Sequence, residues 1–276
     1  SAVAAGLAEE FDAVVVAAGA CAARGVRAEG FEEGLASGDV VYAVDYLTEQ
    51  TRALLEGREP AISAEGKDVV VIGGGDTGND CMGTAVRQGA RTVRQLEYGP
   101  CAPDERTASN AWPEWPNVKK TDYGQEEAIA LQGDDLREWC ADTQRVLLDD
   151  NGHVRGLQVH LLDWSAGKPS AVEGSEREID AQLVLVACGF AGPERGVFDA
   201  LGVPVATAGR PLPVMEGGAT GAVAATHRAE LAEGAAAAGR AAVYVAGDAR
   251  NGSSLVVSSM ADALKCAAEV AVDLGL

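Results

Sequence analysis

Continuous runs of apolar, largely β-branched residues predict the buried strands of this chain. Within each run the apolar residues follow one another and end beside a glycine, which is typical of parallel strands covered on both faces. The runs are residues 11–20, 67–75, 183–190 and 242–248. Apolar residues at helical spacing predict helices over residues 44–55, 77–88 and 255–274. Strands that alternate with helices predict an α/β fold with Rossmann-like parallel sheets.

The pattern changes between about residues 101 and 164. Aromatic and proline residues cluster first, at Trp112, Pro113, Trp115 and Pro116. Residues 145–164 then predict a two-stranded meander, because Asn151 and Gly152 supply a turn that tolerates positive φ. Residues 205–240 are rich in alanine and glycine and predict no definite element.

Length and charge narrow the classes of function. At roughly 150 residues per domain, a chain of 276 residues indicates about two domains. The 22 basic and 42 acidic residues give a net charge of −20, which would repel phosphate backbones and anionic lipid. No apolar run approaches the roughly 18 residues of a membrane span. We therefore expect no nucleic-acid partner and no membrane association.

The cysteines and histidines predict neither a catalytic nor a metal site. The six cysteines form no CxxC or CxxxC pair, and none of the three histidines lies beside a serine or cysteine in a nucleophile motif. Scattered single thiols suit a reducing cytosol, so we expect a cytoplasmic location. The chain begins at Ser1 without a methionine or a signal-peptide pattern, and we expect it to be a piece of a longer protein.

The strongest functional signal is the glycine motif in VVVIGGGDTGND, residues 69–80. It follows a predicted strand and opens a predicted helix, whose N-terminal N–H groups favour phosphate. In this motif Gly73 allows a sharp turn, Gly75 lets the backbone approach a pyrophosphate, and Gly78 lets helix and strand pack closely. The motif predicts a dinucleotide site at Gly73, Gly74, Gly75, Asp76, Thr77 and Gly78.

Residues beyond the next predicted strand bear on the choice of cofactor. Glu97 lies 19 residues beyond Gly78, where an acid hydrogen-bonds the ribose 2′-hydroxyl and favours NADH. Alternatively, Glu97 is only a solvated strand end. Arg94 and Arg106 could instead pair with a 2′-phosphate and favour NADPH. The sequence leaves the choice between NADH and NADPH open.

A second motif, VYVAGDARNGSSLVV at residues 243–257, combines a strand, a loop and the start of a long helix. It resembles the flavin segment of two-dinucleotide flavoproteins, in which an aspartate at this place contacts the ribityl chain of FAD. Residues 11–20 resemble the strand that crosses from the FAD domain of such proteins. The resemblance implies FAD contacts at Gly19, Gly247, Asp248, Ser254 and Leu255.

Together these segments resemble the small (beta) subunit of glutamate synthase and the corresponding C-terminal region of single-chain glutamate synthases. The glycine motif is followed by NAWPEWPNVKKTDYGQEEAIALQGDD at residues 110–135, GSEREIDAQLVLVACGFAGPE at 174–194 and AGDARNGSSLVV at 246–257. The tryptophan–proline segment, followed by the acidic DYGQEE string of residues 122–127, is the most specific of these features. The resemblance weakens over residues 205–240.

The family resemblance implies an electron path. NAD(P)H passes a hydride to FAD, and iron–sulfur clusters carry electrons to a large subunit that makes L-glutamate from glutamine and 2-oxoglutarate. It also implies a remnant of the FAD-binding domain and the crossover at residues 1–66, an NAD(P)H-binding domain at 67–192 and the C-terminal part of the FAD-binding domain at 193–276. Hydride transfer between two cofactors needs alignment rather than an acid or base, so we assign no catalytic residue.

Departures from the family pattern leave two alternatives. The family's first FAD glycine motif and its cluster-binding cysteines would precede Ser1, so we expect an incomplete FAD site and no iron–sulfur cluster in this chain. Ser258, Ser259 and Asp262 occupy a stretch in which the family carries a tryptophan and a glycine. One alternative is a related electron-transfer subunit of the ferredoxin:NADP oxidoreductase or dihydropyrimidine dehydrogenase type. The other is an inactive dinucleotide-binding module.

Overall fold

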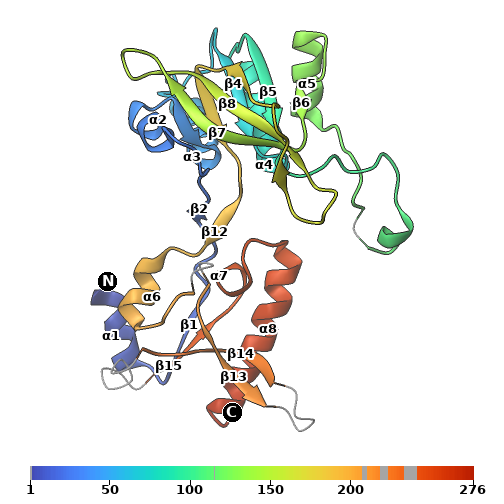
Figure 1. Cartoon of the computed structure of the whole chain (residues 1–276). Helices are drawn as coiled ribbons and strands as arrows, with labels where there is room; N and C mark the ends of the chain where they lie inside the picture. The colour runs from blue at the N-terminus through green and yellow to red at the C-terminus, as the bar shows by residue number, and fades with distance from the viewer. Residues whose placement is uncertain (1, 115, 207–209, 218–222, 233–240) are drawn as a thin grey trace. The chain divides into compact units, whose positions relative to one another are not determined.

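The chain folds into two compact units (Figure 1). The computed structural model describes residues 2–114, 116–206, 210–217, 223–232 and 241–276. The first unit comprises Ser1–Arg24 and Gly189–Leu276, and the second comprises Gly25–Cys188. The second unit is therefore one continuous segment, whereas the first is built from both ends of the chain.

A parallel five-stranded sheet forms the centre of the second unit. In spatial order its strands are β3 (Val40–Tyr42), β11 (Leu183–Val186), β4 (Asp68–Ile72), β5 (Thr92–Leu96) and β6 (Arg137–Glu138). All neighbouring pairs run parallel. Val69, Val70 and Val71 of β4 are each at most 1% exposed. This strand is thus covered on both faces, as its continuous apolar run predicts.

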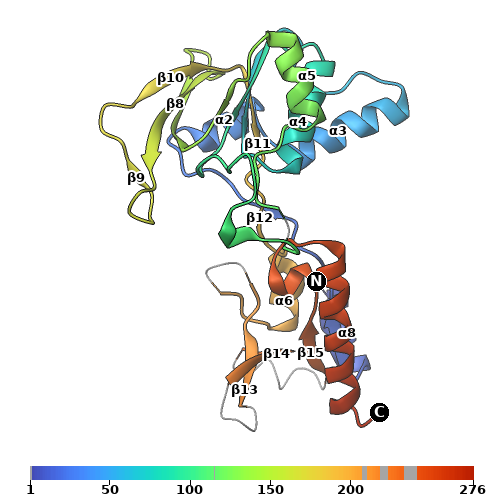
Figure 2. The ribbon, with the colours of Figure 1, turned by 90° about the vertical axis from the view of Figure 1, so that its right-hand side faces the viewer.

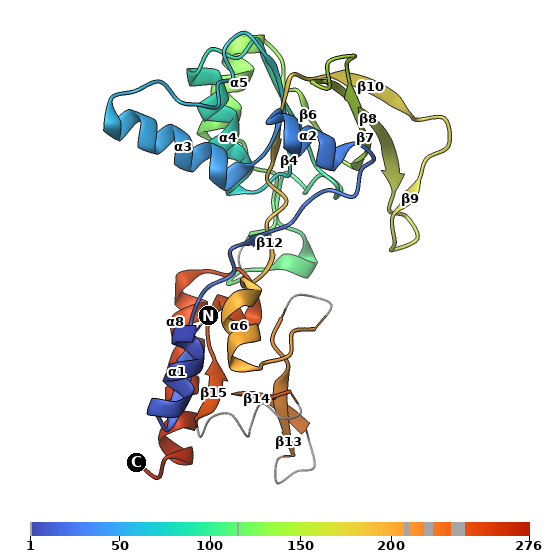
Figure 3. The same ribbon diagram turned by 90° about the vertical axis from the view of Figure 1, so that its left-hand side faces the viewer.

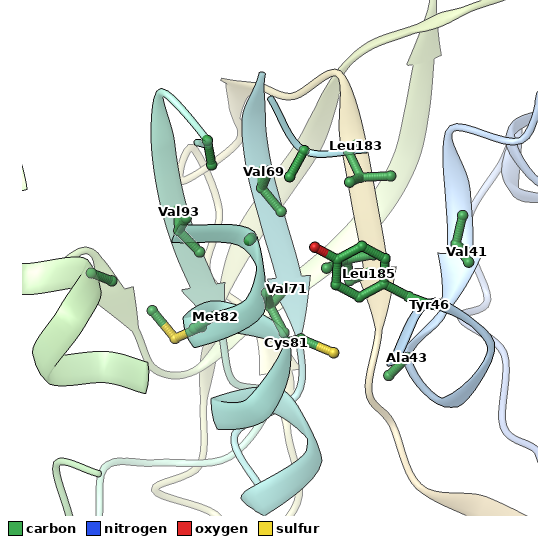
Figure 4. Packing of buried hydrophobic residues seen from close by; sticks show 14 residues of the cluster. Val41, Ala43, Tyr46, Val69, Val71, Cys81, Met82, Val93, Leu183 and Leu185 are labelled. Atoms are coloured by element: carbon green, nitrogen blue, oxygen red, sulfur yellow. The ribbon is translucent and has the colours of Figure 1, made fainter. Parts of the chain in front are cut away.

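Helices cover one face of this sheet (Figure 2). They are α3 (Ala43–Glu56), α4 (Asp76–Arg87) and α5 (Tyr123–Gln132). Tyr46 of α3 and Met82 of α4 belong to the same buried cluster as Val71 and Leu185 of the strands (Figure 4). The helices expected at residues 44–55 and 77–88 are confirmed as α3 and α4.

An antiparallel sheet and a short helix cover the other face (Figure 3). They are β7 (Ala141–Leu148), β8 (Val154–Asp163), β9 (Ser170–Ala171), β10 (Arg177–Asp180) and α2 (Phe31–Ser37). The predicted meander is confirmed, because β7 and β8 pair antiparallel and Gly152 has a φ of +83° in the turn between them. Leu157 and Val159 of β8 pack in one cluster with Val70 and Val184 of the parallel sheet.

The first unit contains a four-stranded mixed sheet. In spatial order its strands are β1 (Ala13–Val16), β15 (Ala242–Val245), β14 (Val223–Ala229) and β13 (Pro213–Gly217). The pair β1–β15 is parallel, whereas β14 pairs antiparallel with both its neighbours. The hairpin β13–β14 lies within residues 205–240, for which the sequence predicted no element. Within that stretch, residues 207–209, 218–222 and 233–240 lie outside the described residues.

The helices of the first unit are α1 (Ala2–Glu10), α6 (Arg195–Leu201), α7 (Asp248–Asn251) and α8 (Val256–Asp273). The last confirms the helix predicted at residues 255–274. Its apolar stripe is largely exposed, since Val256, Met260 and Leu264 are 74%, 61% and 73% exposed. The buried residue of α8 is Cys266. The spacing of apolar residues therefore predicts the helix correctly, but it does not predict which of its faces is buried in the described structure.

The boundaries of the two units differ from the expected domain boundaries. Residues 25–66, which the sequence grouped with the N-terminal remnant, belong to the second unit because β3 joins the edge of its parallel sheet through β11. With three residues, β3 is too short to be recognised from its pattern. Residues 189–192 belong to the first unit, where β12 (Phe190–Gly192) pairs with β2 (Ala22–Ala23).

None of the described helices is both long enough and apolar enough to cross a membrane.

Candidate functional site

The turn from β4 to α4 requires two of its glycines for intramolecular reasons. Gly73 has a φ of +119°, and a Cβ placed on it would lie 2.3 Å from the carbonyl oxygen of Ala187. A Cβ on Gly78 would lie 2.4 Å from the carbonyl oxygen of Gly73. The first turn of α4 thus packs tightly against the end of β4, as the spacing of the glycine motif predicts.

Gly75 is different, because nothing in the described structure requires a glycine there. Its φ of −78° and ψ of −179° are open to any residue, and no heavy atom would lie within 4 Å of an added Cβ. Gly75 is exposed at the N-terminus of α4, ahead of Asp76 and Thr77. The first N–H groups of a helix bind anions, and a side chain at Gly75 would occupy the space in front of them.

Glu97 follows β5 and lies against the glycine loop. A Cβ on Gly74 would come within 2.0 Å of the Glu97 carboxyl carbon. Burial raises the pKa of the Glu97 carboxyl, while the Arg137 guanidinium and a hydrogen bond from the Trp139 side chain oppose that shift. This carboxylate therefore lies beside the backbone that the motif predicts to hold a pyrophosphate.

These groups line a cavity of about 250 Å³ in the second unit. Its walls come from the glycine loop and the start of α4, the residues after β5, the segment before α5 with the start of that helix, and β6 with the residue after it. The lining residues are Gly74, Gly75, Asp76, Asn79, Glu97, Pro100, Ala102, Asn117, Val118, Lys119, Lys120, Asp122, Gln125, Arg137 and Trp139. The walls carry both acidic and basic groups.

The basic groups of the wall surround an indole ring. The Lys119 ammonium lies 4.9 Å from the centroid of the Trp139 ring, and the Arg137 guanidinium lies 5.4 Å from it. The Arg137 side chain, 3% exposed, also pairs with Asp135 and donates to the carbonyl oxygen of Lys120 at 2.7 Å. These contacts hold β6 and the residue after it against the segment before α5, at one wall of the cavity.

The first unit contains a second small-residue turn, between β15 and α7. Gly247 has a φ of +66° and a ψ of −144°, a conformation that favours glycine. The next residue, Asp248, accepts hydrogen bonds from Ser259 at 2.6 Å and from Ser254 at 2.8 Å. The hydrogen bond from Ser259 is the main reason why the pKa of the Asp248 carboxyl is lowered.

A buried ionic network holds this turn in place. Asp262 of α8 accepts a hydrogen bond from the Gly247 N–H at 2.8 Å. Its other oxygen lies 3.2 Å from His227 Nε2 and 3.1 Å from the Arg250 guanidinium. The His227 Nδ1 atom in turn lies 2.6 Å from Glu269. His227 is 5% exposed, so its two ring nitrogens face carboxylates inside the unit.

A cavity of about 410 Å³ opens beside the second turn. Its lining residues are mostly small or apolar: Ala17, Gly19, Ala246, Gly247, Asp248, Ser254, Val256, Ser259, Met260 and Ala263. The carboxylate of Asp248 is the charged group of this wall, and two serine hydroxyl groups orient it.

Comparison with known proteins finds relatives that match most of this chain. The chain is 37% identical over 272 residues to the glutamate synthase (NADPH) small chain of Bacillus subtilis, covering 96% of this chain and 50% of that protein. It is 38% identical over 273 residues to the small chain of Mycobacterium tuberculosis H37Rv, covering 95% and 49%. The chain is homologous to the glutamate synthase small chain.

The homology covers only part of the relatives. The chain spans about half the length of the bacterial small chains that it matches, at 50% and 49%. It is also 36% identical over 268 residues to the glutamate synthase (NADH) of Schizosaccharomyces pombe, covering 94% of this chain and 12% of that protein. No protein-family model matches the chain.

Solved structures agree on the fold. FprA of Mycobacterium tuberculosis in complex with NADPH matches with a TM-score of 0.62 at 17% identity, over 98% of this chain and 65% of that chain. The thioredoxin reductase of T. acidophilum matches with a TM-score of 0.55 at 18% identity, over 96% and 66%. The predicted α/β architecture is thereby confirmed as that of these two oxidoreductases.

Two of the predicted cofactor residues lie away from the first cavity. Arg94 forms an ion pair with Glu138 and lines another groove, with Asp68 and Arg177. Arg106 donates to the carbonyl oxygen of Asn110 at 3.2 Å and is absent from the described lining of the cavity. The structure thus brings Glu97, but neither arginine, to the glycine loop. Trp115, part of the tryptophan–proline segment, lies outside the described residues.

Sequence reasoning missed several residues of the cavity wall, notably Asn79, Lys119, Gln125, Arg137 and Trp139. The DYGQEE string was noticed only as a family signature, although it places Gln125 in the wall. Lys119 lies in the same family segment, residues 110–135, and Trp139 belongs to no recognisable motif. Within the described part of the chain, no group of three or more His, Cys, Asp or Glu residues is arranged to hold a metal ion.

Proposed function

We propose that this chain is the NAD(P)H-oxidising electron-transfer part of a glutamate synthase. It would accept a hydride from NAD(P)H and pass electrons, by way of FAD, to a partner that makes L-glutamate from glutamine and 2-oxoglutarate. The observation that carries this proposal is Gly75, a glycine that the fold itself does not require, at the mouth of a helix N-terminus. Homology to glutamate synthase small chains over about 95% of the chain supports it.

The residues of the first cavity fit a dinucleotide. The N–H groups of Gly74, Gly75, Asp76 and Thr77 would bind the pyrophosphate, while Gly73 and Gly78 shape the turn. The Glu97 carboxylate lies where it would accept a hydrogen bond from a ribose hydroxyl. Lys119, in the same wall, would favour a phosphate instead. NADH and NADPH therefore both remain candidate substrates.

The residues of the second cavity fit part of a flavin. Gly19 and Gly247 leave room in the wall, and Asp248, oriented by Ser254 and Ser259, presents a carboxylate suited to sugar-alcohol hydroxyl groups. Leu255, at the N-cap of α8, precedes a helix N-terminus of the kind that favours negative charge. Bound FAD would supply the acceptor for the hydride. The protein's role is to hold and align the two cofactors rather than to move protons.

The partner and the location follow from the same proposal. The large subunit of glutamate synthase would take up the electrons, through iron–sulfur clusters that we do not assign to the residues of this chain. Six cysteines scattered along the sequence suit a reducing compartment, and we therefore place the protein in the cytoplasm.

An absorption spectrum tests the proposal. The purified chain is incubated with FAD, desalted, and then mixed with NADH or NADPH in the absence of oxygen. A retained flavin band that bleaches on adding either nucleotide is the expected result. An Asp248→Ala variant, which removes the carboxylate of the second cavity, should retain less flavin. A chain that binds neither FAD nor NAD(P)H would contradict the proposal.

One observation favours a second candidate function. Val256 and Met260, in the wall of the second cavity, are 74% and 61% exposed. A flavin held beside so exposed a wall would dissociate readily. The second candidate is therefore a dinucleotide-binding module without turnover. It predicts NAD(P)H binding without bleaching of added FAD.

A further inference from the structure

Two buried glutamine side chains link α5 to the glycine loop. Gln95 of β5 and Gln125 of α5 are 0% and 5% exposed. Gln125 Nε2 donates to Gln95 Oε1 at 3.0 Å, and Gln95 Nε2 donates to the carbonyl oxygen of Gly73 at 2.9 Å. A chain of hydrogen bonds thus runs from the DYGQEE string to the first glycine of the motif.

The contacts of Gln125 determine which amide groups donate and which accept in this hydrogen-bond chain. Gln125 Oε1 accepts a hydrogen bond from the backbone N–H of Asp122 at 2.8 Å, as part of the capping box that begins α5. The amide nitrogen of Gln125 is therefore the end that faces Gln95. Gln95 must accept with its oxygen and donate with its nitrogen. Gln125 is held in turn by Asn79, whose Oδ1 accepts from the Gln125 N–H at 3.2 Å.

The chain of hydrogen bonds orients one peptide group of the loop. A trans peptide is planar, so the C=O of Gly73 and the N–H of Gly74 point to opposite sides of it. The Gly73 oxygen is directed under the first turn of α4, toward Gln95 and Gly78. The N–H of Gly74 must then point away from Gln95. Gly74 and Gly75 both line the first cavity.

We propose that Gln125, acting through Gln95, is a positioning residue for the diphosphate of the dinucleotide. It would hold the Gly73–Gly74 peptide so that the Gly74 N–H faces a phosphate oxygen rather than solvent. Successive backbone N–H groups aimed at one point form an anion-binding concavity. The inference rests on the proposed dinucleotide site, and it assigns to the DYGQEE string a role in ligand binding beyond capping α5.

The test compares ligands that contain a diphosphate with one that does not. Dissociation constants for NADH, NADPH, ADP-ribose and adenosine are measured by calorimetry or competition on the full chain. The Gln125→Met variant keeps the length of the side chain but cannot donate to Gln95. We expect it to weaken binding of the diphosphate ligands roughly tenfold, as for loss of one well-placed hydrogen bond, and to change adenosine binding less than about twofold.

The same helix supplies a matched control. Gln132 of α5 also hydrogen-bonds β5, through Oε1 to the Val93 N–H at 2.5 Å, but it does not contact the glycine loop. Gln132→Met should lower the melting temperature without changing the affinity for either kind of ligand. In a Gln95→Met background, Gln125→Met should have no further effect on the diphosphate ligands, because the chain of hydrogen bonds is already broken.

A second variant keeps the test informative if Gln125→Met fails to fold. Gln125→Glu can still accept from Asp122 but cannot donate to Gln95. Gln95 must then turn its amide toward the new carboxylate, which removes its donor from Gly73, so the same selective loss is expected. Equal weakening of adenosine and NADH, or equal effects of Gln125→Met and Gln132→Met, would overturn the inference. A wild-type chain that binds neither NADH nor NADPH would instead contradict the proposed function itself.

Discussion

The Glu97 carboxyl carbon lies within 2.0 Å of the position that a Cβ on Gly74 would occupy. The middle glycine of the loop and the acid after β5 are therefore packed against each other, although 23 residues (97 minus 74) separate them in the sequence. Two features that sequence reasoning treats as separate ligand contacts thus depend on each other within the protein. A side chain added at Gly74 would require the Glu97 carboxylate to move.

The first prediction concerns stability at this contact. Gly74→Ala should destabilise the second unit by no more than about 1 kcal/mol, because the new methyl group overlaps the Glu97 carboxylate, which ends a flexible side chain and can turn aside. In the double variant Gly74→Ala/Glu97→Ala most of this loss should be recovered. Urea unfolding measures both, with Gly75→Ala as the control, since an added Cβ there meets no atom within 4 Å. If Gly74→Ala destabilises the protein equally in the wild-type and Glu97→Ala backgrounds, overlap with the Glu97 carboxylate is not the cause of the loss.

The second prediction separates ligand binding from folding at the next residue. Gly75→Val should leave the free energy of unfolding within about 0.5 kcal/mol of the wild type, because its surroundings are open. It should weaken NAD(P)H binding at least roughly tenfold, because the side chain blocks approach of the pyrophosphate. Gly196→Val, at an equally open position of α6 in the first unit, is the control for affinity. Unchanged NAD(P)H affinity in Gly75→Val would refute the dinucleotide site.

The third prediction concerns pH. Burial raises the pKa of the Glu97 carboxyl in the folded chain above its value in the unfolded chain. The folded state therefore holds this proton more tightly, and stability falls as pH rises through the window between the two pKa values. Glu97→Gln lacks this dependence. The melting temperature of the variant, relative to that of the wild type, should be higher at pH 7 than at pH 4, and a difference independent of pH would contradict the assignment.

The fourth prediction concerns the choice of nucleotide. In the proposed dinucleotide site Glu97 would accept a hydrogen bond from a ribose hydroxyl, while Lys119 of the same wall would attract a 2′-phosphate. Glu97→Ala should therefore shift the ratio of NADPH to NADH affinity toward NADPH by roughly tenfold, the size of one hydrogen bond to a charged group. Lys119→Ala should shift the ratio the other way. An unchanged ratio in Glu97→Ala would make this carboxylate only a packing partner of Gly74.

The sequence predicted those parts of the structure that leave a local pattern. The apolar runs identify β4, β11 and β15, and the spacing of Gly73 and Gly78 predicts a tight turn that the structure contains. Local patterns do not report partners, however. β3 contains three residues and owes its existence to pairing with β11. The hairpin β13–β14 lies in an alanine- and glycine-rich stretch without an alternating pattern.

The candidate site was predictable in its glycine loop and at Glu97, but not in the rest of its wall. The glycine motif gives the loop, but the wall of the cavity comes from residues that are distant in sequence and brought together by the fold. Gln95 and Gln125 are 30 residues apart, and each is an ordinary polar residue in its own segment. Arg94 is a candidate by its position on β5, and the structure adds that it forms an ion pair with Glu138 of the adjacent strand. Such pairing between strands has no signature in a single sequence.

The last prediction concerns the network behind the second turn. Asp262, whose side chain is 12% exposed, accepts the Gly247 N–H and faces the cationic side chain of Arg250 and the ring of His227. Asp262→Ala would leave the Gly247 N–H, His227 and the partly buried Arg250 without this carboxylate, at a cost of about 1–3 kcal/mol. Because Gly247 and Asp248 would lose their support, retention of FAD after desalting should fall as well.

A matched change in the same unit isolates this effect. Asp199 of α6, with a side chain 61% exposed, forms a solvent-exposed pair with Arg195 at 3.9 Å. Asp199→Ala should cost less than about 1 kcal/mol and leave FAD retention unchanged, since exposed pairs contribute little. Asp262→Asn keeps the acceptor for Gly247 but loses the charge, so it should retain more flavin than Asp262→Ala. If Asp262→Ala is no less stable than Asp199→Ala, the network does not hold the turn.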